Sequence, residues 1–389
     1  MGGATGGRVI AHVIAEFSAK EAMGRTVLET VRRVPGVHHL VTSAAHDTHE
    51  AFADVHELGG PMMTFPLQVR DDLARVLAEI RPDVIHLHVG ALGPVLALAS
   101  DLRRHPLVTT VYAWPSLPPP GAWRRASLRE MRQSNVLQPR VVATTFLPRA
   151  AVKAALRRSG TRAILTPDPR VLDRLGSSVG GAPVHRLPSG APTDARRAHR
   201  ADTAPTVVFG GRAETVRGID TLLEAFPLVL DAVPDARLRL LLIPRPEMAD
   251  ILRTAGTTRL GSSLDVVTEP VPDLLDELAG AQVGVWPFKF DYVTSPPAMA
   301  VAEALSVGLP VVATDVACIR AVVRPGVDGV IVPPADARSL AQGIIGLLRN
   351  DATWARYAAA GPVAMAERFG WEHAAEVTDE AYSGACDLS

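Results

Sequence analysis

The chain has 389 residues, of which 47% are hydrophobic and 21% charged, and its formal net charge is −1 at pH 7. This length allows two domains with separate cores, and the composition excludes a disordered chain and a membrane-embedded one. The near-neutral charge argues against nucleic acid as the main partner. The only cysteines are Cys318 and Cys386, and no signal peptide or spanning run is visible, so the sequence predicts a cytoplasmic protein.

The first half of the chain alternates apolar runs with helical patterns. Strands are expected at 8–17, 81–90, 106–115, 163–166 and 184–187, and helices at 25–33, at 67–80 and through Leu98 and Leu102. Strands that alternate with helices are typical of a parallel sheet. The first strand-to-helix loop lacks the G-x-G-x-x-G pattern, which argues against a dinucleotide site there.

The segment 123–158 is strongly basic. Its only acid is Glu130, and its cations are Arg124, Arg125, Arg129, Arg132, Arg140, Arg149, Lys153, Arg157 and Arg158. Two amphipathic helices are expected, at 123–137 and 150–158, with Val152 and Leu156 as apolar members of the second. The segment predicts either a face for an anionic lipid surface or acidic acceptor, or solvated helix faces in an arginine-rich protein.

After a polar stretch at 195–205, the sequence TVVFGGRAETVRGIDTLLEAF (206–226) is typical of a strand, a Gly-Gly turn and a helix. Arg212 and Arg217 fall on one loop at the carboxyl end of that strand, where open α/β sheets bind ligands. Further strands are expected at 237–243 and 264–267.

The stretch SPPAMAVAEALSVGLPVVATD (295–315) is typical of a helix followed by a buried strand. Ser295 is the expected N-cap, and Gly308 the expected end of the helix. The start of a helix leaves backbone N–H groups unsatisfied, which suits a phosphate. Glu303, two turns into the helix, can reach a polar ligand group beside that phosphate.

The chain resembles the retaining glycosyltransferases of family 4, which have the GT-B fold. The resemblance rests on Glu303 with the following ALSVGLPVVATD, and on Gly-Arg followed five residues later by a second cation. It implies two Rossmann-like domains facing a central cleft: an acceptor-side domain at 1–194, a linker at 195–205 and a nucleotide-sugar domain at 206–367. A terminal helix at 368–389 would cross back to the first domain.

For the donor site, the resemblance implies that Arg212 and Arg217 neutralise the donor diphosphate and that Glu303 binds the ribose. The leaving phosphate would take the acceptor proton, so no side-chain base is required. Further donor contacts are expected at Gly24, His88, Gly211, Lys289, Ser295, Pro297, Ala298 and Met299. Several of these assignments have plainer alternatives: Arg212 and Arg217 as surface arginines, Gly24 as a turn glycine, Lys289 as a solvated loop cation, and Glu303 as an exposed helix residue. His86 is expected to be a core histidine.

Two residues depart from the family where the sugar should lie. Ser295 stands in place of a glutamate that holds sugar hydroxyls, and Tyr112 in place of a histidine near the reacting carbon; Tyr112 could instead only pack. The departures predict either an altered donor sugar, such as a deoxy or amino sugar, or a nucleotide-binding protein that has lost catalysis. In the first case we expect a hexosyltransferase of natural-product or cell-envelope glycan synthesis.

The expected donor is a nucleoside-diphosphate sugar, of UDP or dTDP type, and the expected acceptor is a small molecule or a lipid-linked one. No cofactor, metal or nucleic acid is expected. The protein would be peripheral to the inner membrane face if the basic segment binds lipid.

Overall fold

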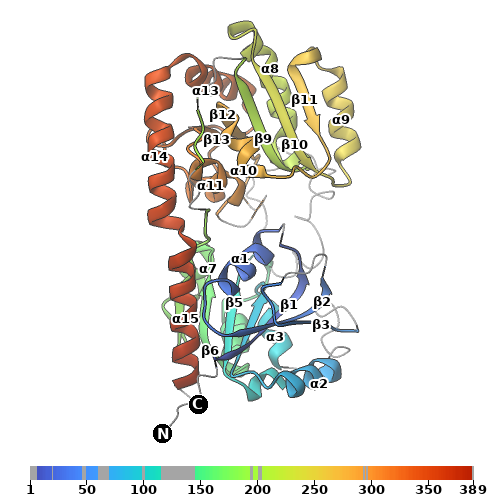
Figure 1. Cartoon of the computed structure of the whole chain (residues 1–389), viewed down its shortest axis with the longest axis vertical. Coiled ribbons are helices and arrows are strands. Elements are labelled where there is room, and N and C mark those ends of the chain that lie inside the picture. Colours follow the sequence, from blue (N-terminus) through green and yellow to red (C-terminus); the bar gives the residue numbers. More distant parts are fainter. Residues whose placement is uncertain are drawn as a thin grey trace. The chain divides into compact units, whose positions relative to one another are not determined.

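The computed structural model describes residues 7–19, 21–45, 50–59, 70–98, 101–114, 145–192, 196–199, 204–291, 294 and 297–387. The chain forms two compact units, each labelled by its elements in Figure 1. Unit 1 is drawn from 1–115, 143–190 and 371–389, and unit 2 from 116–142 and 191–370. The last helix of the chain therefore belongs to the unit in which the chain begins.

Unit 1 is built on a sheet whose described strands follow the order β3-β2-β1-β4-β5-β6-β8-β7. Neighbours are parallel except for β7 and β8. The strands are β1 (Val9–Phe17), β2 (Val37–Ala45), β3 (Asp54–Glu57), β4 (Val84–Val89), β5 (Leu107–Val111), β6 (Thr161–Thr166), β7 (Ser178–Val179) and β8 (Ala182–Arg186). Every residue of β4 and β5 is buried, as expected for central parallel strands covered on both faces.

Helices cover both faces of this sheet. They are α1 (Ala22–Val31), α2 (Arg70–Ile80), α3 (Gly93–Leu98), α6 (Arg149–Arg158), α7 (Pro169–Leu175) and α15 (Trp371–Asp387), with a 3-10 turn η1 at Asp101–Arg104. Helix α2 packs with Ala11 and Val13 of β1, whereas α1 packs with Ile14 and Phe17. Helix α15 lies beside α1 and contacts β4, β5 and β6 (Figure 1).

Unit 2 contains a parallel sheet in the order β11-β10-β9-β12-β13-β14. Its strands are β9 (Thr206–Arg212), β10 (Arg237–Ile243), β11 (Leu264–Val267), β12 (Val283–Trp286), β13 (Val311–Thr314) and β14 (Gly329–Val332). Numbered within the unit, this is the order 3-2-1-4-5-6 of a doubly wound nucleotide-binding sheet. The predicted Rossmann-like architecture of the two units is confirmed.

The helices of unit 2 are α8 (Ile219–Ala232), α9 (Met248–Thr257), α10 (Leu274–Ala279), α11 (Met299–Ser306), α12 (Ala317–Arg320), α13 (Ala337–Arg349) and α14 (Asp351–Phe369), with 3-10 turns η4 (Thr215–Arg217) and η5 (Gly261–Ser263). Helix α13 packs against α8 and the strands β12 to β14, and α11 against β12, β13 and α14. Among the helices of the described ranges, none is long and apolar enough to cross a bilayer.

Two predictions of secondary structure were wrong. No strand was predicted between residues 34 and 60, yet β2 pairs with β1 from Val37 to Ala45 and β3 adds a further strand. Helix α11 begins at Met299 with Ala298 as its N-cap, so Ser295, which lies outside the described residues, is not that cap.

Candidate functional site

The strand order of unit 2 indicates where on its sheet a ligand is expected to bind. Strands β9 and β12 are neighbours, and the chain leaves them toward opposite sides of the sheet, so a crevice is expected outside their carboxyl ends. Arg212 ends β9, and Lys289 follows β12 by three residues. The structure thus brings the predicted donor residues of the Gly-Arg loop and of the 287–291 segment to one edge.

Arg217 is held in the 3-10 turn η4, and 9% of it is exposed. Its Nε donates to Glu214 Oε2 at 2.9 Å, and its guanidinium lies over the Phe288 ring. Burial lowers the pKa of Arg217; Glu214 opposes this shift, and the positive charge of Arg212 adds to it. A bound anion would oppose both the burial and the charge of Arg212, and so would stabilise the charged form of Arg217.

Two glycines lie in this loop. A Cβ on Gly211 would lie 3.5 Å from the Arg217 guanidinium, which is an ordinary van der Waals contact, so space alone does not require a glycine there. Gly218 has φ of 76°, and a Cβ there would meet the carbonyl oxygen of Pro287 at 1.9 Å. The loops after β9 and β12 therefore touch backbone to backbone, which only a glycine permits.

Lys289 is not the solvated cation that the sequence allowed. Only 4% of the residue is exposed, and its Nζ donates to Asp220 Oδ2 at 2.6 Å. Its backbone N–H donates to the Val216 carbonyl, which joins it to η4. In this structure Lys289 stabilises the arginine loop through these contacts.

The first turn of α11 only partly matches its predicted role. The N–H of Ala298 donates to the Cys318 carbonyl at 3.2 Å, so it is not available for a phosphate. The N–H groups of Met299 and Ala300 follow, and no acceptor for them is found among the described residues. Pro297, the residue before Ala298, is buried.

Glu303 is 4% exposed, so it is not an ordinary surface glutamate of the helix. Its backbone carbonyl accepts from Ser306 Oγ at 2.8 Å within the helix. A carboxylate buried in α11 requires specific partners, which is consistent with a binding role.

Glu247 was missed by the sequence analysis. It lies in the loop after β10, next to β9 in the sheet, and 1% of it is exposed. Neither carboxylate oxygen has a hydrogen-bond partner among the described residues. Burial raises the pKa of Glu247, and the negative charge of Glu214 adds to this. Nothing in the local sequence PRPEM signals this burial, which depends on how the loop folds over the sheet.

In unit 1, Tyr112 lies just past the end of β5. Its backbone N–H donates to the Val89 carbonyl, and its hydroxyl lies 3.2 Å from His88 Nδ1. Burial raises the pKa of Tyr112 well beyond the physiological range, so the hydroxyl stays protonated. The Tyr112 hydroxyl therefore has a polar partner inside unit 1.

His88 and Gly24 do not lie as predicted. His88 is 3% exposed, and both of its ring nitrogens have protein partners, so it has no nitrogen left for a ligand. Gly24 lies inside α1, and a Cβ there would meet the Ser18 carbonyl oxygen at 2.1 Å. The close approach of Ser18 explains this glycine without a ligand.

His12, His86 and His88 offer ring nitrogens that lie within 4.8 Å of one another. All three are buried on one face of the sheet, and burial lowers their pKa values well below 6.5. The sequence analysis found no such cluster because its members come from two strands. Each ring nitrogen already has a hydrogen-bond partner, so the cluster is complete without a metal.

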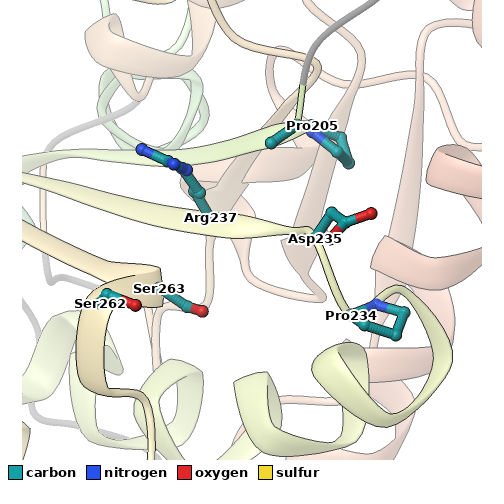
Figure 2. A pocket seen from close by; sticks show the side chains of 7 residues that line it. Pro205, Pro234, Asp235, Arg237, Ser262 and Ser263 are labelled. Carbon is teal, nitrogen blue, oxygen red and sulfur yellow. The ribbon is translucent and has the colours of Figure 1, made fainter.

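A pocket of about 420 Å³ lies at the other edge of the unit 2 sheet (Figure 2). It is lined by Ala204, Pro205, Pro234, Asp235, Arg237, Ser262 and Ser263. These residues precede or begin β9, β10 and β11. Ligands of doubly wound sheets bind at carboxyl ends, so this pocket is not the nucleotide site.

Comparison with known proteins finds similar glycosyltransferases. Residues 204–350 match the family model described as "Glycosyl transferases group 1". The chain is 29% identical over 374 residues to the phosphatidyl-myo-inositol mannosyltransferase of Mycobacterium tuberculosis H37Rv, covering 88% of this chain and 87% of that protein. It is 26% identical over 341 residues to a D-inositol 3-phosphate glycosyltransferase of Nocardioides sp., covering 85% and 73%.

Solved structures agree on the fold. A sucrose-phosphate synthase from Thermosynechococcus elongatus superposes with a TM-score of 0.73 at 19% identity, over 98% of this chain and 100% of that chain. WaaG, a glycosyltransferase involved in lipopolysaccharide biosynthesis, superposes with a TM-score of 0.67 at 13% identity, over 96% and 99%.

Proposed function

Since the chain is a retaining group 1 glycosyltransferase of family 4 with the GT-B fold, we propose that it transfers a sugar from a nucleoside diphosphate to an inositol phosphate acceptor. The relatives described above act, by their names, on D-inositol 3-phosphate and on phosphatidyl-myo-inositol. Both acceptors carry a phosphate on an inositol ring, which is the chemistry we assign to the acceptor here.

The observation that carries the donor assignment is the pair Arg212 and Arg217. The two cations lie on one loop at the carboxyl end of β9, and the positive charge of Arg212 disfavours the charged form of Arg217. A diphosphate carries the negative charge that would relieve this repulsion, and guanidinium groups bind phosphate oxygens in bidentate geometry. The N–H groups of Met299 and Ala300, for which the described residues offer no acceptor, add a positive dipole end at the start of α11.

The same groups would accelerate the reaction. When the glycosidic bond to the diphosphate breaks, negative charge grows on the leaving oxygen, and positioned cations and N–H groups stabilise it most at that moment. The acceptor hydroxyl can lose its proton to a phosphate oxygen of the leaving group. In this proposal Glu303 binds the ribose, and Tyr112 contacts the sugar.

The donor sugar differs, in our proposal, from the common hexoses. Tyr112 stands where family members have a histidine, and Ser295, which lies outside the described residues, where they have a glutamate. A sugar with a deoxy or amino position needs fewer hydroxyl contacts than glucose does.

The first test is a thermal-shift panel of nucleoside diphosphates and their sugars, carrying uracil, thymine, guanine or adenine. A ligand at a hundred times its dissociation constant stabilises the protein by about 2.7 kcal/mol. We expect ligands of one base to stabilise the wild type but not Arg212→Ala. The control is Arg237→Ala, which removes an arginine at the opposite edge of the sheet and should be stabilised like the wild type. A protein that no member stabilises would contradict the donor assignment.

Turnover separates an enzyme from a nucleotide-binding protein that has lost catalysis. The donor from the panel is supplied with soluble inositol 3-phosphate in one arm and with vesicles containing phosphatidylinositol in the other. Transfer in either arm establishes the acceptor class and identifies its source. If the protein binds the donor but transfers no sugar in either arm, the result would favour a nucleotide-binding protein that has lost catalysis.

A further inference from the structure

Four imidazoles lie side by side in a layer that should be apolar. His12 of β1 pairs in register with His86 of β4, and His88 lies two residues further along β4, on the same face. His38 of β2 pairs with Ile10, which places it on this face as well. None of the four is more than 4% exposed. A core that breaks the apolar pattern so consistently indicates a function.

Three of the four, His38, His12 and His88, form a continuous row of hydrogen bonds. His38 Nε2 lies 2.8 Å from the Val34 carbonyl oxygen, and His38 Nδ1 lies 2.9 Å from His12 Nε2. His12 Nδ1 lies 3.0 Å from His88 Nε2. The row ends at the Tyr112 hydroxyl, 3.2 Å from His88 Nδ1.

The Val34 carbonyl determines the direction in which every hydrogen bond of the row is donated. A carbonyl oxygen only accepts, so His38 must donate from Nε2, and in a neutral imidazole Nδ1 is then an acceptor. His12 must therefore donate from Nε2 to His38 and accept at Nδ1. His88 donates to His12 in the same way, and its Nδ1 accepts from Tyr112. Burial lowers the pKa values of all three histidines, so each is neutral at pH 7.

We propose that this one-way chain of hydrogen bonds, in which each group donates toward the Val34 carbonyl, makes Tyr112 a hydrogen-bond acceptor toward the donor sugar. The site would then select a sugar substituent that donates a hydrogen bond. The hydroxyl proton of Tyr112 is committed to His88, which leaves only oxygen lone pairs for the ligand. A histidine at this place could present an N–H instead. This inference rests on the proposed function, because it takes Tyr112 to contact the sugar. His12, His38 and His88 are positioning residues, since they act through Tyr112.

A metal ion would require a different arrangement. Coordination by His12, His86 and His88 would use one ring lone pair from each residue. In the row of hydrogen bonds, His12 and His88 each have one lone pair, and it already accepts from His88 Nε2 and from the Tyr112 hydroxyl, respectively. Metal binding and the one-way chain therefore exclude each other.

The tautomers of the histidines directly test the direction of the hydrogen bonds in the row. The full-length protein is labelled with ¹⁵N-histidine, and long-range ¹H–¹⁵N spectra are recorded at pH 7.5, with Tyr112→Phe used to identify His88 and His38→Gln to identify His38. We expect His12, His38 and His88 all to carry the proton on Nε2. A proton on Nδ1 of any of them would overturn the proposal, as would stoichiometric Zn²⁺ binding that shifts the His12 and His88 signals.

Removing the hydrogen bond between His38 and Val34 tests what sets the direction of donation along the row. His38→Leu removes the link to Val34, and we expect the His12 and His88 signals to show both tautomers. His39→Leu is the matched control, because His39 is the next residue but lies on the other face of β2. Unchanged tautomers in His38→Leu would show that Val34 does not set the direction.

The donor selected by the panel tests the consequence. Each sugar hydroxyl is replaced in turn by fluorine, which cannot donate a hydrogen bond. We expect one position to lose about fivefold or more in affinity with the wild type and much less with Tyr112→Phe. Equal losses with both proteins would overturn the acceptor role of Tyr112. If no donor binds, the proposed function fails, and the tautomer measurement still decides on the chain.

Discussion

The buried histidines should make the stability of unit 1 depend steeply on pH. Burial, together with the neighbouring histidines, holds the pKa values of His12, His86 and His88 well below 6.5, so they are neutral in the folded state. The unfolded chain binds protons at these side chains once the pH falls below about 6.5. Their contribution to stability is therefore complete above that pH and is lost as the pH falls below it.

The size of the effect follows from linkage. A histidine that stays neutral in the folded state costs about 1.4 kcal/mol per pH unit below its unfolded pKa. Three such residues lower the free energy of unfolding by about 4 kcal/mol between pH 7.5 and 5.5. This is a large part of the stability of an ordinary domain, which is about 5–15 kcal/mol.

Guanidinium unfolding followed by circular dichroism at pH 7.5, 6.5 and 5.5 measures this dependence. His86→Gln can keep hydrogen bonds to Thr110 and Tyr382 but does not titrate, so it should remove about a third of the pH dependence. The transition that this variant shifts identifies unit 1. His373→Gln, on the exposed surface of α15, should leave the dependence unchanged. A wild type equally stable at pH 7.5 and 5.5 would refute the reasoning.

Three further predictions concern the edge of unit 2. The raised pKa of Glu247 means that its buried carboxylate costs stability at neutral pH. Glu247→Gln should therefore raise the free energy of unfolding by about 1–2 kcal/mol at pH 7.5, seen as a higher melting temperature, and by less at pH 4. Gly218→Ala should cost at least about 2 kcal/mol in denaturant unfolding, through its positive φ and the contact with Pro287. Asp220→Asn weakens the pairing of the buried Lys289 ammonium and should cost about 1–3 kcal/mol in the same assay; no change would show that other contacts suffice.

The sequence predicted the parts of the fold that local patterns determine. Strands such as β10, at Arg237–Ile243, match the apolar runs, and the helix and strand around Glu303 were expected before the structure placed them. The placement of Arg212 and Arg217 on one loop could be predicted because that loop directly follows a strand, so that sequence spacing alone brings its residues together.

Features that depend on pairing between distant segments could not be predicted in this way. Strand β2 contains two adjacent histidines, which lowers its likeness to a buried strand, and it is stable because β1 covers one edge and His38 is hydrogen-bonded. The burial of Lys289 likewise depends on Asp220, 69 residues away. Glu247 is buried by a loop whose course the sequence does not indicate.

Tyr112 shows how the two kinds of information combine. The sequence marks it as a departure from the family and leaves open whether it packs or binds. A tyrosine that only fills space needs no fixed hydroxyl orientation, and its ring could be accommodated by apolar neighbours. Here three buried histidines, which cost stability whenever the pH falls, orient that hydroxyl. A core that carries such a cost is most simply explained by a requirement on the direction of one hydrogen bond, which a packing residue would not impose.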